Sequence, residues 1–236
     1  MRNRSNACLG LLVVTSLFAS AAVQASGPTI FGAKKQEQAV TIPLQSVNAT
    51  QREAVRQILE KPTLSARSQA ETFPAKVDAY RYFLDHPERA VTAWRRLQAK
   101  CVSIQAHGNQ QFSWADENGS EVTWQTVLSQ PDLRVWYAEG KVKPGPLLPL
   151  VPVKVVVVLR YTEILLPDGK VGLQHQTDMA IHTDSKTALV VTKMLGPSAQ
   201  RMAEQGLGQF QFFFGGLSFY LSRYPEQAAA LMRDEQ

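Results

Sequence analysis

Four side chains that can bind a metal ion or transfer a proton lie close together in the chain: His175, Asp178, His182 and Asp184. The residues around them alternate between apolar and polar types, which predicts a strand whose successive side chains point to opposite faces. Asp178 and His182 therefore share one face, and His175 lies on the other. A metal-assisted enzyme would need a further ligand from a neighbouring strand, for which His107 is the candidate. We interpret Asp178 and His182 as a polar pair on the sheet and predict no metal site.

A second group of acid and base side chains surrounds Pro87. Asp85, His86 and Glu88 stand next to this proline. Proline favours the first turn of a helix, and a carboxylate is stabilised at the same helix end. We therefore interpret Asp85 or His86 as a helix cap and not as a catalytic group.

The sequence lacks the common motifs of enzymes. It contains no glycine-rich phosphate loop, no nucleophile elbow, no paired-cysteine metal motif and no His-Glu-x-x-His pattern. We assign no catalytic residue and predict no cofactor, which leaves open whether the protein is an enzyme.

The first 25 residues have the features of a secretory signal peptide. Arg2 and Arg4 precede an apolar run from Leu9 to Val23, and the residues up to Ala25 fit the rule for signal-peptidase cleavage. The run is interrupted by hydroxyl residues and is short for a membrane span. We predict that residues 1–25 are removed and that the protein is exported to the periplasm or the extracellular space.

Loss of the signal peptide would change the charge and the cysteine content. The formal net charge of +5 would lose two arginines and fall to about +3, which is ordinary for a domain of this size. Nucleic acid is therefore not an expected partner. Cys101 would be the single remaining cysteine and could form no intramolecular disulfide.

The rest of the chain divides into a leader and one domain. Residues 26–47 are rich in glutamine, lysine and small residues, which predicts a flexible leader with an edge strand at Ala39 to Leu44. No linker interrupts residues 48–236, so we predict a single α+β domain there.

Helical spacing of apolar residues predicts helices at both ends of this domain. The expected helices are Thr50 to Glu60, a helix with Val77, Tyr80, Phe83 and Leu84 on its buried face, a helix that begins at Pro87, a long helix from Pro197 to Arg223, and a short terminal helix from Pro225 to Met232.

Between these helices the apolar residues alternate, which predicts strands. The expected strands are Cys101 to Ala106, Gln111 to Ala115, Glu121 to Leu128, Leu133 to Glu139, Val153 to Leu166, Lys170 to Thr183 and Thr187 to Met194. Consecutive hairpins are the simplest way to join them, so we predict a curved antiparallel sheet of about six to seven strands.

Two apolar segments stand out as candidate binding surfaces. The loop from Lys141 to Pro152 contains four prolines and three leucines, although loops are normally polar. It either packs over the core or presents Leu147 and Leu148 to a ligand or, beside Lys141 and Lys143, to a membrane surface.

The second segment, Gly206 to Leu221, is uncharged and holds five phenylalanines. A helix that is apolar on nearly all sides must be covered on more than one side. Glycine costs about 1 kcal/mol relative to alanine inside a helix, so Gly208, Gly215 and Gly216 predict close approach of a neighbouring group.

This order of elements resembles the helix-grip arrangement of the START-like (SRPBCC) superfamily of hydrophobic-ligand-binding proteins. The resemblance extends from Ala39, where the first strand would begin, to Arg223 at the end of the long helix. It implies a cavity between that helix and the curved sheet.

The resulting hypothesis is an exported soluble protein that binds or carries an apolar or amphipathic small molecule such as a lipid. The residues predicted to bind it are Phe210, Phe213, Phe214, Leu217, Val171, Leu173, Met179, Leu147 and Leu148. An alternative is a structural protein that binds a partner, or a second copy of itself, through Phe212 and Phe219. Transient contact with a membrane surface is also expected, while the oligomeric state stays open.

Overall fold

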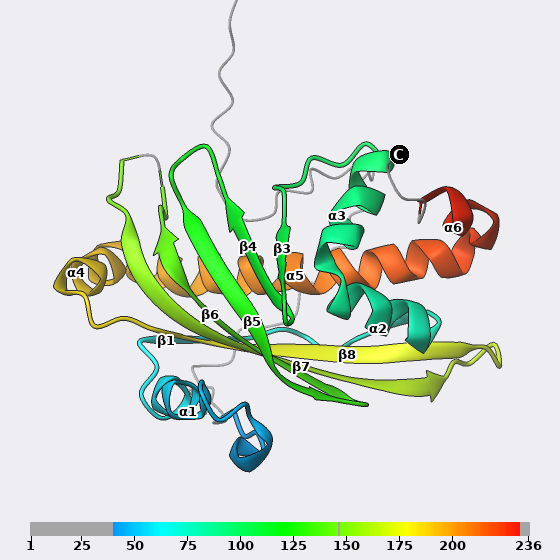
Figure 1. Ribbon diagram of the computed structural model, residues 1–236, viewed down its shortest axis with the longest axis horizontal. Coiled ribbons are helices and arrows are strands. Elements are labelled where there is room, and N and C mark those ends of the chain that lie inside the picture. The colour runs from blue at the N-terminus through cyan, green and yellow to red at the C-terminus, as the bar shows by residue number, and fades with distance from the viewer. Residues whose placement is uncertain (1–39, 146, 232–236) are drawn as a thin grey trace, which may run out of the picture.

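A curved antiparallel sheet lies at the centre of the computed structural model, which describes residues 40–145 and 147–231 (Figure 1). Eight strands form this sheet within the described residues, in the order β1-β8-β7-β6-β5-β4-β3, and β2 also pairs with β8. The strands are β1 Leu64–Arg67, β2 Glu71–Pro74, β3 Gln105–Gly108, β4 Gln111–Ala115, β5 Glu121–Gln130, β6 Leu133–Val142, β7 Val151–Leu165 and β8 Val171–His182.

Helices cover both faces of the sheet. They are the 3-10 turn η1 Leu44–Ser46 and the α-helices α1 Arg52–Glu60, α2 Val77–Asp85, α3 Pro87–Arg96, α4 Lys186–Leu195, α5 Pro197–Arg223 and α6 Pro225–Leu231. The long helix α5 crosses one side of the sheet and α1 lies on the other (Figure 1). We call the α5 side the inner face and the α1 side the outer face. The predicted α+β class, with a long C-terminal helix across a curved sheet, is confirmed.

Successive side chains of β6 and β7 point to opposite faces of the sheet and contribute to two separate cores, one on each face. Trp136, Leu159 and Tyr161 pack with α2, α3 and α5 on the inner face. Val135 and Val158 pack with α1 on the outer face. Both sets are buried, because a strand that is covered on both sides places apolar residues at consecutive positions.

The first strand is not where the sequence predicted it. Residues 40–43 form no strand and are followed by η1, while β1 and β2 lie in the stretch 63–74, whose polar residues concealed them. Both strands are four residues long and pair with β8. β1 and β2 therefore take the place of the strand that was expected before the helical pair α2 and α3. The sheet with α5 across it fits the helix-grip arrangement.

The segment predicted as the last strand, Thr187 to Met194, is the helix α4. Its β-branched residues favour a strand by propensity. In the structure the hydroxyl of Ser185 accepts a hydrogen bond from the amide of Ala188 at 3.3 Å and caps a helix. Ala188 and Val191 are buried against the start of β7, so tertiary burial overrides local propensity.

The predicted leader is only partly covered by the structure. Within residues 40–47, Ile42 and Val47 are buried in the outer core. The predicted signal peptide and residues 26–39 lie outside the described residues. In the part of the chain that the structure describes, no helix is long and apolar enough to cross a membrane.

Candidate functional site

The aromatic segment of α5 meets other side chains of the inner core. The ring of Trp136 lies 5.3 Å from that of Phe210 and 6.3 Å from that of Phe214, measured between centroids. Trp94 of α3 donates a hydrogen bond from its indole nitrogen to the backbone oxygen of Phe213 at 2.9 Å. Rings at these separations are in packing contact, so protein side chains occupy this part of the inner face.

Four residues that were predicted to bind a ligand belong to this packed region: Phe213, Phe214, Leu217 and Leu173. Leu173 and Leu217 have no solvent-exposed surface at all. A ligand could therefore touch these two side chains only if α5 moved away from the sheet.

The other predicted ligand-binding residues are spread over the molecule. Phe210 of α5 and Met179 of β8, which packs against α5, are half-buried. Val171 is exposed at the start of β8, next to the β7–β8 turn. Leu147 and Leu148 lie in the β6–β7 loop, at the opposite end of β7, and Leu147 is 96% exposed. The structure thus does not bring Val171 together with the two leucines.

At the edge of the packed region, the inner face has apolar side chains that are only half-buried, of which Trp124 still packs against the inner core and Val153 against α4: Trp114, Val122, Trp124, Val153 and Val155. We call this set the open apolar end. Trp124 is paired in register with Ala138, and Ala138 with Val155, so the set continues across β5, β6 and β7. Trp124 also lies two positions from Thr126, the register partner of Trp136, and therefore faces the same side as Trp136.

The sequence analysis missed the open apolar end. Alternation placed Trp124 and Val155 in strands, but alternation only separates the two faces of a strand and does not show which face lies under α5. The register resolves this. Trp136 is 4% exposed, as is Phe112, the register partner of Trp124, whereas Trp124 and Trp114 on the same face are half-buried. An apolar molecule would therefore find accessible surface at this end of the sheet.

A buried polar network joins α2, β2 and β8 under α5. The hydroxyl of Tyr80 and Nδ1 of His175 are 2.8 Å apart, and Nε2 of His175 lies 3.3 Å from the carboxylate of Glu71. Burial lowers the pKa of His175 below its ordinary value, and the hydrogen bond with Glu71 opposes this. Burial also raises the pKa of Tyr80 well above its usual range, assisted by the nearby Tyr161 and Glu71.

These pKa directions favour a neutral imidazole and a protonated phenol. Tyr80 then donates to Nδ1, which leaves the ring proton on Nε2, facing Glu71. Tyr80 and His175 are both inaccessible to solvent, at 0% and 1% exposure. Tyr80 and His175 therefore hold α2 and β8 together and are inaccessible to a substrate, while the carboxylate of Glu71 is 55% exposed at the edge of the network. The prediction that His175 lies on the other face of the strand from Asp178 and His182 is confirmed, and this face is the inner one.

A second polar contact anchors α5 to the edge of the sheet. Gln211 is buried in the apolar helix, accepts a hydrogen bond from Ser68, and donates one to the backbone oxygen of Gln69 at 3.0 Å. Ser68 also accepts from the amide of Thr177 at 2.9 Å. This contact fixes α5 beside the β1–β2 connection, because a buried amide side chain is costly without partners.

Asp178 and His182 lie on the outer face but have separate partners. Asp178 is buried between two arginines: it accepts hydrogen bonds from Arg67 and from Arg160, the latter at 2.6 Å. His182 contacts the backbone oxygen of Lys61 at 2.8 Å and the carboxylate of Asp184 at 2.9 Å. The predicted shared face is correct, and the predicted pair is not formed.

No candidate metal centre occurs among the described residues, since no three of their His, Cys, Asp and Glu side chains converge.

The start of α3 differs from the predicted helix cap. His86 stands at the cap position without a side-chain cap bond, while Asp85 pairs with Arg134 at 2.8 Å.

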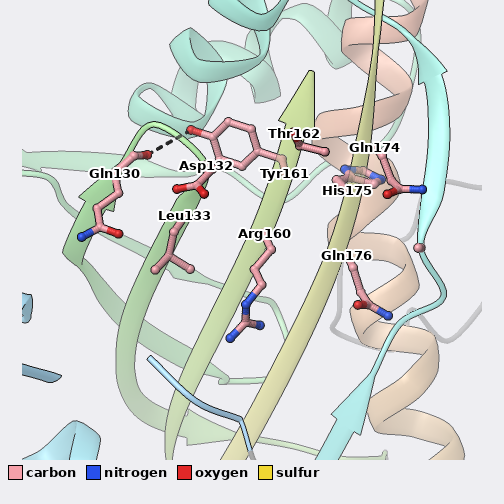
Figure 2. Close-up of a pocket in the computed structure, with 10 residues that line it drawn as sticks. Gln130, Asp132, Leu133, Arg160, Tyr161, Thr162, Gln174, His175 and Gln176 are labelled. Carbon is pink, nitrogen blue, oxygen red and sulfur yellow. Dashed lines mark hydrogen bonds between the residues drawn. The ribbon is translucent and has the colours of Figure 1, made fainter. Parts of the chain in front are cut away.

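A polar pocket of about 330 Å³ opens beside β7 and β8 (Figure 2). Its lining residues are Ala70, Gln130, Asp132, Leu133, Arg160, Tyr161, Thr162, Gln174, His175 and Gln176. Gln174 and Gln176 alternate with the inward-facing His175 and therefore belong to the outer face. Arg160 is already bonded to Asp178 and to the backbone oxygen of Thr41. With this lining, the pocket is poorly suited to an apolar ligand.

Comparisons with known proteins show only distant likeness. No protein-family model matches the chain, and no curated protein matches it in sequence. A conserved protein from Geobacillus kaustophilus has a similar structure, with a TM-score of 0.41, 12% identity, and coverage of 65% of this chain and 95% of its own. The protein Ara h 8.0201 has a TM-score of 0.37 and 11% identity, with coverage of 65% of this chain and 96% of its own.

A hypothetical protein from Helicobacter pylori has a TM-score of 0.36 and 10% identity, with coverage of 82% of this chain and 99% of its own. Because all three TM-scores lie below 0.5, we draw neither family nor function from these likenesses.

Proposed function

We propose that this protein is an exported, START-like binding protein for an apolar or amphipathic small molecule such as a lipid. The observation that supports the proposal is the open apolar end, where Trp114, Trp124 and Val155 remain half-buried on the inner face. The predicted residues Phe210 and Met179 border the packed region and would contact the ligand first. Export is supported by the signal-like residues 1–25.

Burial of apolar surface alone can supply the affinity. Each Å² of apolar area that leaves water contributes about 25 cal/mol, and the ligand needs no catalytic group to bind. A ligand that enters deeper would have to separate Phe210 and Phe214 from Trp136. We therefore place the apolar part of the ligand against Trp124 and Val155 and its polar part toward solvent.

The test uses protein expressed from the full chain, with its N-terminus determined after purification. We expect native mass spectrometry and lipid extraction to find a co-purifying apolar molecule, and a fluorescent fatty-acid analogue to bind saturably. Trp124→Ala should weaken that binding roughly tenfold, since the loss of about 60 Å² of ligand contact is worth about 1.5 kcal/mol.

Leu165→Ala serves as the matched control, because Leu165 is also a large apolar residue but is 74% exposed at the far end of β7. Val155→Thr provides a second variant with nearly the same shape and a polar group on the ligand surface. Absence of any co-purifying molecule together with no saturable binding by the wild type would overturn the proposal, as would equal weakening in the Leu165 control.

A second candidate function, binding of a protein partner, is supported by the outer side of α5. Phe212 and Phe219 are seven residues apart, on one helical face, and each is 45% exposed. Next to Phe212 a depression of about 480 Å³ is lined by Gln205, Gly208 and Gln209. An exposed aromatic pair beside a depression is a suitable anchor for a second chain.

Sedimentation separates the two candidates. If α5 forms a dimer contact, the wild type should sediment as a dimer, and Phe212→Glu with Phe219→Glu should convert it to a monomer. Leu165→Glu is the control for a new charge on an exposed apolar residue. If the wild type stays monomeric at all concentrations tested, the hypothesis of self-association through α5 is wrong.

A further inference from the structure

The helix α4 and the adjoining β6–β7 loop expose apolar side chains at one end of the sheet. Met194 is 73% exposed, Val190 55% and Leu189 41%, and Leu147 of the loop is almost entirely exposed. The inner side of α4 is fixed, since Ala188 and Val191 are buried against Leu148 and Val151. The exposed residues therefore stand on a rigid support. We call Leu147, Lys186, Leu189, Val190, Lys193 and Met194 the α4 surface.

The charge on α4 itself is positive, although the carboxylate of Asp184 lies two residues before the helix and is 77% exposed. Between Ser185 and Ala203 the chain has three cationic side chains, Lys186, Lys193 and Arg201, and no carboxylate. All three are exposed. At 100° per residue, Lys186 and Lys193 fall at the middle of the solvent-facing side of α4, with Leu189 on one flank and Val190 and Met194 on the other.

We propose that the α4 surface docks the protein onto an anionic lipid membrane. A helix with lysines and apolar residues on its free face lies in the interface of a bilayer, where the apolar groups enter the acyl boundary and the lysines contact anionic headgroups. The combination of cationic and apolar groups favours a lipid surface over a neutral protein patch. The loop with Lys141 and Leu147, which the sequence alone suggested for membrane contact, then assists α4.

Docking at this surface would bring the membrane next to the open apolar end. Val153 belongs to both features: it is one of the half-buried residues of the inner face and packs with Ala188 and Val191 of α4. A lipid could therefore pass between bilayer and protein over a short distance. Docking itself does not rest on ligand binding, because the α4 surface would contact a membrane whether or not the inner face holds a lipid.

Vesicle binding tests the inference. Protein expressed from the full chain, and shown by N-terminal sequencing to lack residues 1–25, is sedimented with vesicles of phosphatidylcholine and phosphatidylglycerol or of phosphatidylcholine alone. We expect binding to the anionic vesicles that weakens with added salt. Lys186→Glu with Lys193→Glu should reduce this partitioning roughly tenfold or more. Val190→Ser with Met194→Ser should weaken binding without changing the charge.

Lys61→Glu with Lys100→Glu is the matched control, since it makes the same change in net charge at exposed lysines outside α4. Equal loss of binding in this control would assign the effect to overall charge and overturn the proposal. Failure of the wild type to bind anionic vesicles would also overturn the proposal. If the protein then self-associates through Val190, the α4 surface is a contact between two copies of this chain. The ligand-binding assays and the vesicle assay are independent measurements. The proposed ligand binding and the proposed membrane docking can therefore fail separately.

Discussion

Replacing Gly215 by alanine is expected to destabilise the protein by about 1–3 kcal/mol. A Cβ atom at this position would lie 2.7 Å from Cε1 of His175 and 3.2 Å from the ring of Phe73. The His175 ring cannot retreat without cost, because Tyr80 and Glu71 hold its two nitrogens and the Phe73 ring packs against it with centroids 4.7 Å apart. Urea unfolding monitored by tryptophan fluorescence gives the change in the free energy of unfolding.

Gly208→Ala is the matched control in the same helix. An added Cβ there would meet nothing within 4 Å, so the substitution should stabilise the protein by up to about 1 kcal/mol through helix propensity alone. The two variants are thus expected to shift stability in opposite directions. If Gly215→Ala and Gly208→Ala stabilised the protein equally, the ring of His175 would be free to move, and the prediction would be wrong.

Replacing Asp178 by alanine is expected to lower the free energy of unfolding by about 3 kcal/mol. The carboxylate is 2% exposed and lies between Arg67 and Arg160. Its removal leaves two arginines facing each other across the outer face without their shared partner. The arginines are 34% and 40% exposed, so water will solvate them in part, which places the expected loss at the lower end of the range for buried pairs.

Asp168→Ala provides the comparison for this second prediction. Asp168 is also paired, with Lys170 at 3.0 Å in the β7–β8 turn, but its side chain is 53% exposed. Exposed pairs contribute little, so its removal should leave unfolding nearly unchanged. A similar, small effect of both substitutions would mean that Asp178 does not hold β1, β7 and β8 together.

Local periodicity made several elements predictable. The spacing of Val77, Tyr80, Phe83 and Leu84 predicts α2, and all but Val77 are fully buried. The bounds of α5 agree with the expected Pro197 to Arg223, since proline favours a helix start and the apolar pattern continues to the end. Strands β5 to β8 follow from alternation. In each case the signal lies within a few residues of chain.

Edge strands and α4 were not predictable in this way. β1 and β2 are short and half-exposed, so their sequence shows no alternating apolar run. Residues 187–194 have strand propensity, and their helical state depends on burial of Ala188 and Val191 against β7. These contacts join residues far apart in the chain, which a local pattern does not contain.

The sequence by itself determined the α+β class, the helical pair, the meander and the uncharged aromatic helix, because these depend on local spacing. It also contains the basis for the proposed export, in residues 1–25. Only the tertiary structure decided what the phenylalanines of α5 meet. Phe213 and Phe214 contact protein side chains, and the half-buried surface lies instead around Trp124. The reason is physical: whether apolar residues face each other or a ligand depends on strand register and helix placement, which bring together residues about 78 positions apart, such as Trp136 and Phe214.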